Sequence, residues 1–585
     1  MTETEAAPTS KPVKALATKE PTAMNPSSAQ PTEKGTTSPP KKRKRTTKKK
    51  NTAAVTGPTA DGSSSKRAVH SPPPPPPPTH ILVVDNGGDV IKYGWSTDQQ
   101  PQHIPNVTAR LPAQWTVLAG DQLASISNPN QLIGVTRSME RGIITNLGNQ
   151  VQVWKRMLEL LNVTCRLSTE TAKAFGWKVA RPGSSAAAVS DTATTTPIKA
   201  STCAILLTVP PHSPRSVLDQ ILQVWLEDFG FAHVGLSVAS TCAAVQQAHA
   251  DYRTCCLVDL GWSAMQIVPM YEDKVIDAAA IRRLGVAGRH LINMWKYFAS
   301  YRQWNLMDQE WILKDVLHQT GFVSRQFKED IGLAKKVPAG RRPYDREYLL
   351  PDQQNNFQGS VRLPLALRKQ ADGQDEENES DDEDDEDVDE NEMEAEEDED
   401  DHDVAENEEE LANSDDEESP AEIRRRLLKQ REEEQRHRRE MEEEQQVLNV
   451  TVERFTIPEA LFRPSDVGLP SDWANLPAAI VQSISACPKA LQAALFQSIH
   501  LVGGLSQLSN LKERLEQELR ALAPCEFGVV ITASESPVDQ AWSGACKLAE
   551  QGTYTDWSVS LSDYDAVSKR GAWKRLLVSN GGHLI

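Results

Sequence analysis

One short pattern constrains the fold of this chain more than any other: a run of apolar strand-forming residues followed by Asp, one further residue and Gly. The first copy spans residues 80–88 (HILVVDNGG), and the second spans residues 255–261 (CCLVDLG). A weaker third copy, residues 499–504 (IHLVGG), precedes a helical pattern from Leu511 to Leu522. Such runs followed by a Gly-rich turn predict buried strands that enter tight hairpins.

Two such turns in separate halves of one chain suggest a nucleotide clamp. Glycine lets backbone N–H groups approach phosphate oxygens, and each Asp could hold a hydrated divalent cation. One turn alone would be a weak signal, because many β-hairpins begin with Asp-x-Gly. Amphipathic helical patterns lie between the predicted strands, for example at residues 150–161, 217–228 and 288–299. Strands that alternate with helices indicate an α/β protein.

Charge divides the chain into segments. Of its 585 residues, the stretch 372–420 contains 31 acidic residues and no Lys or Arg, whereas the net charge of the whole chain is −19. A basic excess of about +9 lies before Thr79, so the remaining body is nearly neutral. We expect a disordered basic tail (1–79), a folded body (80–371), an acidic disordered insert with a charged helix (372–446) and the last part of the body (447–585).

The tail contains a dense basic cluster, and it ends in a proline run from Pro72 to Pro78. The cluster consists of Lys41, Lys42, Arg43, Lys44, Arg45, Lys48, Lys49 and Lys50. It predicts nuclear import, with contact to nucleic-acid phosphate or mere solubilisation as alternatives. The proline run is typical of a stiff spacer, although it could also dock an aromatic groove.

The chain lacks the features of a membrane or secreted protein. No apolar run reaches the roughly 18 residues that a membrane span needs, and no signal-peptide pattern is present at the N-terminus. Its eight cysteines form no Cys-x-x-Cys pair, which argues against zinc and favours reduced structural thiols. We therefore expect no metal and no membrane partner, and a location in the nucleus, with the cytoplasm as a second compartment.

Longer matches resemble the actin family. The first hairpin, with Lys92 and Gly94 after it, resembles the first phosphate loop of actins. Residues 453–465 (ERFTIPEALFRPS) are similar to the actin segment that follows a Leu-Pro-Asp hairpin, present here at residues 350–352. Residues 541–549 (AWSGACKLA) resemble the actin helix Trp-x-Gly-x-x-x-Leu-Ala. This resemblance implies two ribonuclease-H-like α/β halves around a nucleotide cleft.

Other stretches resemble the sixth class of actin-related proteins. They are Ile104-Pro-Asn106 with Ala109-Arg110, Arg141–Asn146 with Gln152-Val-Trp154, Ser300–Gln303 with Met307-Asp308, and Pro464–Gly468. The resemblance implies a non-catalytic scaffold subunit of an SWR-type chromatin remodeller, which supports variant-histone exchange and transcription regulation. The implied partners are the remodeller ATPase subunit and a small zinc-finger subunit, with histones and nucleosomal DNA as further candidates and no homopolymer. The alternative is a nucleotide-binding actin-like ATPase or a cytoskeletal actin-related protein.

The residues that retain part of the clamp are the candidates for cofactor binding. They are Asp85, Asn86, Gly87, Gly88, Lys92, Asp259, Gly261, Gly503 and Gly504. They predict ATP or ADP bound without hydrolysis, but the same residues would also serve as structural turns in an empty cleft. No catalytic residue is predicted.

Several departures from the actin pattern argue against ATP turnover. Gly88 and Asp89 replace Ser and Gly in the first loop, and an Asp at position 89 would repel a phosphate. Trp262 and Ser263 replace Asp and Gly in the second loop. The further replacements are Cys242, Gln266, Lys314, Leu317 and His318. Because phosphoryl transfer depends on positioned water and metal, losing several of these groups together makes hydrolysis improbable.

The acidic insert has two interpretations. It could bind basic histone surfaces, since complementary charge raises encounter rates. It could equally be a tolerated surface insertion, because long disordered insertions change stability little. Ser380 and Ser414 precede acidic runs and are candidate sites for an acidophilic kinase.

Overall fold

A computed structural model describes residues 78–111, 116–124, 133–166, 197–247, 254–272, 274–351, 358–371, 424–431, 436, 445–470 and 473–566. The chain divides into two units, 1–73 and 74–585, and every described residue belongs to the second. The basic cluster, nearly all of the proline run and the acidic stretch 372–420 lie outside the described residues. Residues 424–431 of the predicted charged helix are α-helical.

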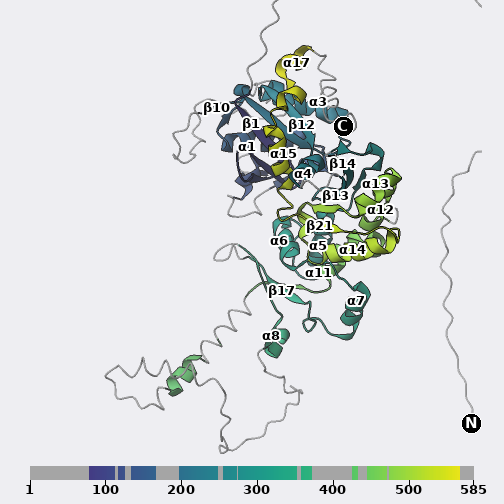
Figure 1. Cartoon of the computed structure of the whole chain (residues 1–585). Helices are drawn as coiled ribbons and strands as arrows, with labels where there is room; N and C mark the ends of the chain where they lie inside the picture. Colours follow the sequence, from purple (N-terminus) through teal and green to yellow (C-terminus); the bar gives the residue numbers. More distant parts are fainter. Residues whose placement is uncertain are drawn as a thin grey trace, which may run out of the picture. The chain divides into compact units, whose positions relative to one another are not determined.

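Two six-stranded sheets of the same design form the framework of the body (Figure 1). The first sheet has the order β22-β12-β11-β1-β2-β3, and in the second β15-β14-β13-β20-β21 is joined by β16, which pairs with β14. The strands of the first sheet are β1 (His80–Asn86), β2 (Val90–Trp95), β3 (Gln102–Pro105), β11 (Cys203–Val209), β12 (His233–Val238) and β22 (Val559–Ser560). Those of the second are β13 (Thr254–Leu260), β14 (Met265–Tyr271), β15 (Lys274–Val275), β16 (Arg282–Leu284), β20 (Ile499–Val502) and β21 (Ile531–Ala533).

Each sheet is built around one of the hairpins predicted from the sequence. β1 pairs antiparallel with β2 and parallel with β11, and β13 pairs antiparallel with β14 and parallel with β20. Both β1 and β13 are apolar on both faces because helices cover both sides of each sheet. In β1, for example, Leu82 and Val84 belong to one core cluster while Val83 belongs to another.

Different helices cover the two sheets. Against the first pack α1 (Leu147–Leu160) and α3 (Arg215–Gln223), which continues into a π-helical turn at Val224–Asp228. Against the second pack α5 (Gly288–Arg302), α6 (Glu310–Thr320), α12 (Leu476–Ser485), α13 (Lys489–Phe496) and α14 (Leu511–Leu522). The helices predicted at 150–161, 217–228 and 288–299 are thus present with ends that differ by a few residues, and the one predicted at 511–522 has the same bounds. The predicted α/β actin-like fold class is confirmed.

Two further helices join the halves. α4 (Ala239–Gln247) and α15 (Gln540–Glu550) lie side by side between the sheets (Figure 1). They cross so closely at Gly544 that a Cβ there would lie 1.7 Å from the carbonyl oxygen of Cys242. Trp542 beside it is buried, and its Nε1 donates a hydrogen bond of 3.1 Å to the carbonyl of Val83 in β1. Trp542 and Gly544, two residues apart, therefore fix how α15 packs against the first sheet and against α4.

Each half carries a smaller three-stranded sheet. The first is formed by β4 (Val107–Leu111), β5 (Thr116–Ala119) and β6 (Ile133–Arg137). The second is formed by β17 (Arg346–Leu349), β18 (Ser360–Arg362) and β19 (Val447–Val450), with β17 in the middle. Both strands that flank the insert therefore pair with the same strand.

The remaining short elements complete the described body. They are β7 (Met139–Glu140), β8 (Ile143–Ile144), β9 (Val163–Thr164), β10 (Ile198–Lys199), α7 (Phe327–Lys336), α8 (Leu365–Ala371), α11 (Glu453–Thr456), α16 (Tyr554–Trp557) and α17 (Leu561–Ala566). β1 begins at His80, α8 ends at Ala371 and β19 begins at Val447, while the domain boundaries themselves stay predictions. None of the helices in the described ranges is long and apolar enough to cross a membrane.

Candidate functional site: a closed cleft between the two hairpins

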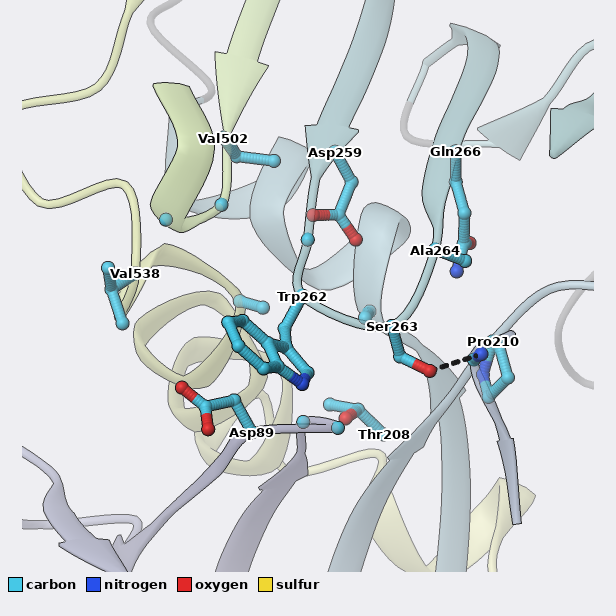
Figure 2. A pocket seen from close by; sticks show the side chains of 18 of the residues that line it. Asp89, Thr208, Pro210, Asp259, Trp262, Ser263, Ala264, Gln266, Val502 and Val538 are labelled. Atoms are coloured by element: carbon cyan, nitrogen blue, oxygen red, sulfur yellow. Dashed lines mark hydrogen bonds between the residues drawn. The ribbon is translucent and has the colours of Figure 1, made fainter. Parts of the chain in front are cut away.

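A cavity of about 270 Å³ lies where the turns of the two large hairpins face each other (Figure 2). Its lining includes eight of the nine predicted cofactor residues. They are Asn86, Gly87, Gly88, Lys92, Asp259, Gly261, Gly503 and Gly504. The ninth, Asp85, lies directly behind them. The cavity is slightly smaller than the roughly 300–1,000 Å³ of small-molecule pockets.

Asp85 is held by two partners on neighbouring strands. The β1–β2 register places Lys92 directly opposite Asp85, and its Nζ lies 3.1 Å from Asp85 Oδ2. The hydroxyl of Thr208 on β11 donates to Asp85 Oδ1 at 2.6 Å. Burial disfavours the ammonium of Lys92, yet the charge and hydrogen bond of Asp85, together with the charges of Asp259 and Asp539, outweigh this, and the pKa of Lys92 is raised. Lys92 is therefore held as a cation beside the Asp85 carboxyl group.

Asp259 occupies the same place in the second hairpin but lacks such a cation. Opposite it on β14 stands Gln266, and on the other side stands Val502 of β20. Burial, together with the negative charge of Asp85, raises the pKa of Asp259 to about 7, although Lys92 opposes the shift. At neutral pH this carboxyl is thus only partly ionised.

Gly503 brings the third motif against Asp259. It has a φ of +89°, which side chains rarely adopt, and a Cβ there would lie 2.7 Å from Asp259 Oδ1. Gly504 has open space around its Cα, because nothing would lie within 4 Å of a Cβ at that position. The structure therefore places all three predicted glycine turns around one cavity.

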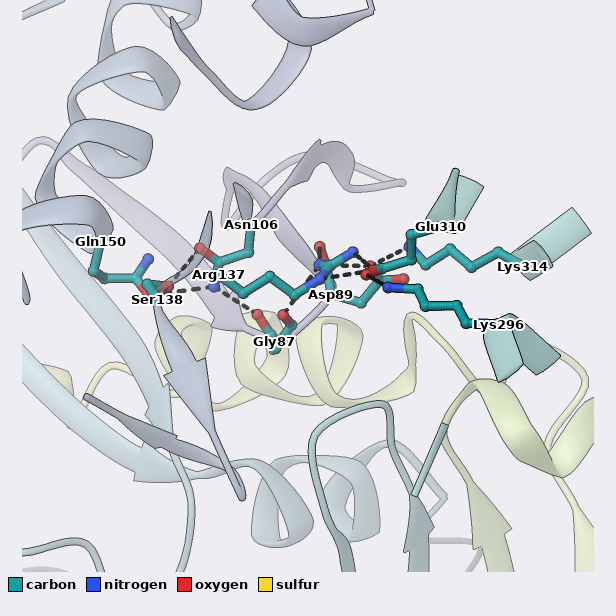
Figure 3. A network of polar contacts seen from close by, with 10 residues as sticks. Gly87, Asp89, Asn106, Arg137, Ser138, Gln150, Lys296, Glu310 and Lys314 are labelled. Atoms are coloured by element: carbon teal, nitrogen blue, oxygen red, sulfur yellow. Dashed lines mark hydrogen bonds and ion pairs between the residues drawn. The ribbon is translucent and has the colours of Figure 1, made fainter. Parts of the chain in front are cut away.

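Asn86 points into the protein. Its side-chain oxygen accepts hydrogen bonds from Gln150 Nε2 at 3.2 Å and Trp154 Nε1 at 3.1 Å, both on α1. Asn106 donates to the carbonyl of Gly87 at 2.9 Å and to Gln150 Oε1 at 3.2 Å (Figure 3). These buried amides hold the first turn in place, so Asn86 acts as an anchor of the loop.

Sequence reasoning missed this anchoring role. Asn106 and Trp154 stood out only as members of stretches similar to one class of actin-related protein, and Gln150 only as the start of a helix. Ser138, which donates to Asn106 at 2.8 Å and Gln150 at 2.6 Å, gave no signal at all. The pairing of distant amides depends on tertiary structure, which local patterns do not encode.

The two turns are in contact with each other. A Cβ on Gly88 of the first turn would lie 2.6 Å from Ser263 Cβ of the second. Ser263 Oγ also accepts a hydrogen bond of 2.8 Å from the backbone N–H of Gly142. In this geometry a phosphate group cannot lie between Gly88 and Ser263, and the Asp89 carboxylate that lines the cavity opposes a polyphosphate.

Trp262 extends from the second turn into the middle of the cavity, with Asp259 on one side and Asp89 on the other (Figure 2). Its ring packs on Gly288 at the start of α5, where a Cβ would lie 2.9 Å away. The side chain fills part of the cavity, and it supplies no carboxylate.

Asp89 belongs to a network of charges between the first turn, β6, α5 and α6 (Figure 3). It contacts Lys314 of α6, and its Oδ1 lies 2.9 Å from Arg137 Nη1. Glu310 lies 2.5 Å from Arg137 and 3.2 Å from Lys296. The negative charge of Asp89, which was expected to repel a phosphate, is thus paired with cations of the protein itself.

The other departures have different positions. Gln266 is buried and lines the cavity. On α6, Leu317 belongs to the hydrophobic core, whereas His318 is exposed. Cys242 is buried in α4, where burial raises the pKa of its thiol to about 12, and it does not line the cavity. In the part of the chain that the structure describes, no group of three or more His, Cys, Asp or Glu side chains could hold a metal ion.

Two duplicated sheets, each with an Asp-bearing hairpin facing a shared cleft, define a protein of the actin class. The family model described as Actin matches residues 77–575, and the chain belongs to this family. Its relatives include proteins named Actin-related protein 6, which confirms the predicted resemblance to the sixth class. The one from Arabidopsis thaliana is 26% identical over 507 residues, covering 85% of this chain and 99% of the relative.

Two other relatives agree. Actin-related protein 6 of Dictyostelium discoideum is 26% identical, covering 83% of this chain and 92% of its own length. That of Drosophila melanogaster is 23% identical, covering 85% of this chain and 99% of its own length. The similarity therefore extends over nearly the whole of each relative.

Proposed function

We propose that this chain is a non-catalytic, actin-related scaffold subunit of an SWR-type chromatin-remodelling complex that supports exchange of a variant histone into nucleosomes. The observation that carries the non-catalytic part is Trp262. Its ring fills the place in the cleft where hydrolysis would require an ordered water and a metal ion. The similarity to proteins named Actin-related protein 6 supports the assignment to the sixth class.

An exposed aromatic corner supports the role of a subunit within an assembly. It is formed by the end of α5, the following turn and the start of α6, and its members are Tyr297, Tyr301, Trp304, Met307 and Trp311. Tyr297 is 65% exposed and Tyr301 is 93% exposed. Tyrosine, tryptophan and methionine are enriched at protein interfaces, and a cluster of exposed large apolar residues usually marks one. We assign this corner to a protein partner within the complex.

The proposed partners and location follow from the same assignment. The partners are the remodeller ATPase subunit and a small zinc-finger subunit, with histones and nucleosomal DNA as further contacts. The cluster at residues 41–50 supports import into the nucleus. The acidic stretch 372–420, with its 31 acidic residues, is suited to basic histone surfaces and would oppose stacking into a homopolymer.

A rival function is a nucleotide-dependent ATPase or a cytoskeletal actin-related protein. The retention of Asp85, Lys92 and Asp259 around one cavity favours it, since these groups suit a cation and phosphate. It requires the phosphate groups to be bound beside Trp262 and Asp89, which line the cavity. Release of inorganic phosphate from ATP by the purified chain would support this rival.

Affinity purification of the tagged full chain from nuclear extract, followed by mass spectrometry, tests the scaffold proposal. We expect recovery of a remodeller ATPase and a small zinc-finger protein. Recovery of the chain alone, or of cytoplasmic actin-binding proteins, would contradict the proposal. The double variant Tyr297→Ser/Tyr301→Ser should lower the yield of partners, whereas Tyr271→Ser, at a tyrosine 40% exposed on β14, is the matched control.

A further inference from the structure

The charge network at the mouth of the cleft connects parts of the chain that are distant in sequence. Asp89 lies in the first turn, Arg137 at the end of β6, and Lys314 on α6 of the other half. The side chains are only 14% exposed for Arg137, 24% for Asp89 and 29% for Lys314. Water therefore screens these charges less than it screens ion pairs on an open surface.

Arg137 has the most contacts in the network. It pairs with Asp89 at 2.9 Å and with Glu310 at 2.5 Å, and it also donates to the carbonyl of Asp89 at 3.3 Å. Its guanidinium lies 5.1 Å from the centre of the Trp262 ring. One side chain thus links the first turn, the second turn and α6.

Lys314 completes the closure from the opposite side. Its ammonium contacts Asp89 and lies 4.6 Å from the centre of the Trp262 ring. Burial lowers the pKa of Lys314, while the charge of Asp89 opposes this. The carboxylate of Asp89 therefore favours the charged form of Lys314 in this position.

The charge balance shows why Asp89 matters. Three cations, Arg137, Lys296 and Lys314, face two anions, Asp89 and Glu310. With Asp89 present, the network has an excess of one positive charge. Without Asp89, the excess would be two positive charges. A bound polyphosphate would have to displace Asp89 from its cations and then meet its negative charge close by.

We propose that Asp89 is a built-in anionic ligand that, with Arg137, Lys314 and the Trp262 ring, holds the two halves closed without a nucleotide. The cleft thereby disfavours polyphosphates, and the two halves are held together without a bound cofactor. This inference goes beyond the scaffold role and does not depend on any remodeller, because a scaffold with a bound, unhydrolysed nucleotide would contradict it while leaving the scaffold proposal intact.

The first test uses the purified full chain with Mg-ATP as the probe. We expect no nucleotide to be released when gently purified protein is denatured, and no change of Tm when Mg-ATP is added. Stoichiometric release of ATP or ADP, or a rise of Tm in Mg-ATP, would overturn the proposal. Both measurements use the natural chain, so neither depends on the folding of a variant.

The second test measures the network itself. Asp89→Asn should lower Tm by about 3 °C at low ionic strength, and less in high salt, since salt screens the lost attraction. Asp308→Asn, at an exposed residue between α5 and α6, is the control and should leave Tm unchanged. Adding Lys314→Gln to Asp89→Asn should restore part of the loss, because it removes the unpaired cation. An Asp89→Asn variant as stable as the control, or strictly additive effects, would refute the network.

Discussion

Asp259 provides a sensitive probe of the state of the cleft. Its carboxyl lies in the second hairpin, where burial and the charge of Asp85 raise its pKa from 3.8 to about 7. Replacing it by Asn keeps the shape of the side chain but removes the ionisable group. We expect Asp259→Asn to be more stable than the natural chain at and above neutral pH.

The magnitude and sign follow from proton linkage. Below about pH 4 the carboxyl is protonated in both the folded and the unfolded chain, so its raised pKa causes no loss of stability. As pH rises toward 7, the unfolded chain releases the proton while the folded chain keeps it, and stability falls. A shift of about 3 units at about 1.36 kcal/mol per unit gives an upper bound of about 4 kcal/mol.

Thermal unfolding of the full chain from about pH 4.5 to about pH 8.5 provides the assay. The difference in Tm between Asp259→Asn and the natural chain should be small at the acid end and grow up to neutral pH, then stay level. Asp308→Asn should show no such growth. If Asp259→Asn is less stable than the natural chain above pH 7, the carboxylate is ionised and bound to a cation, and the picture of a closed, nucleotide-free cleft is wrong.

Two other perturbations test packing and burial elsewhere in the body. Gly544→Ala should destabilise the protein by about 3 kcal/mol or more, because its Cβ would collide with the Cys242 carbonyl, and Tm would show it. Gly332→Ala in α7 meets nothing within 4 Å and should raise stability by up to about 1 kcal/mol; equal effects of the two substitutions would refute the close helix crossing. Burial lowers the pKa of His500 to about 4, so the natural chain should lose stability as pH falls from about 6.5 toward 4, and His500→Asn should flatten this slope in a pH series of Tm.

Strands and helices with strong periodic signals were predictable from the sequence. The runs at 80–88 and 255–261 contain so many β-forming apolar residues that no other structure buries them, and both form central strands. The helix predicted at 511–522 has the same bounds in the structure, where its apolar positions face the core. Helix starts were less predictable. α1 begins three residues before the predicted start because Asn146 caps it by accepting a hydrogen bond from the backbone of Asn149.

The position of the candidate site was predictable, but its chemistry was not. Three glycine turns were expected at one cleft because the family order places them there, and the cavity contains them. The partners of Asp89 come from residues 48 and 225 positions away, so no local pattern could reveal that its charge is neutralised. The sequence likewise showed that Trp262 replaces a carboxylate, but not that its ring would pack between Gly288 and two cations.

The small sheet of the second half has a practical consequence. Its strands β18 and β19 both pair with β17, so the end of β18 at Arg362 and the start of β19 at Val447 are held on either side of β17, opposite Glu347 and Leu349. A loop whose ends are fixed in this way can be lengthened with little penalty, since doubling its length costs only about 0.6 kcal/mol. The segment between Ala371 and Val447 is thus a suitable place for the insertion of a foreign sequence. A fluorescent reporter or affinity tag inserted there would leave the cleft and the two large sheets undisturbed.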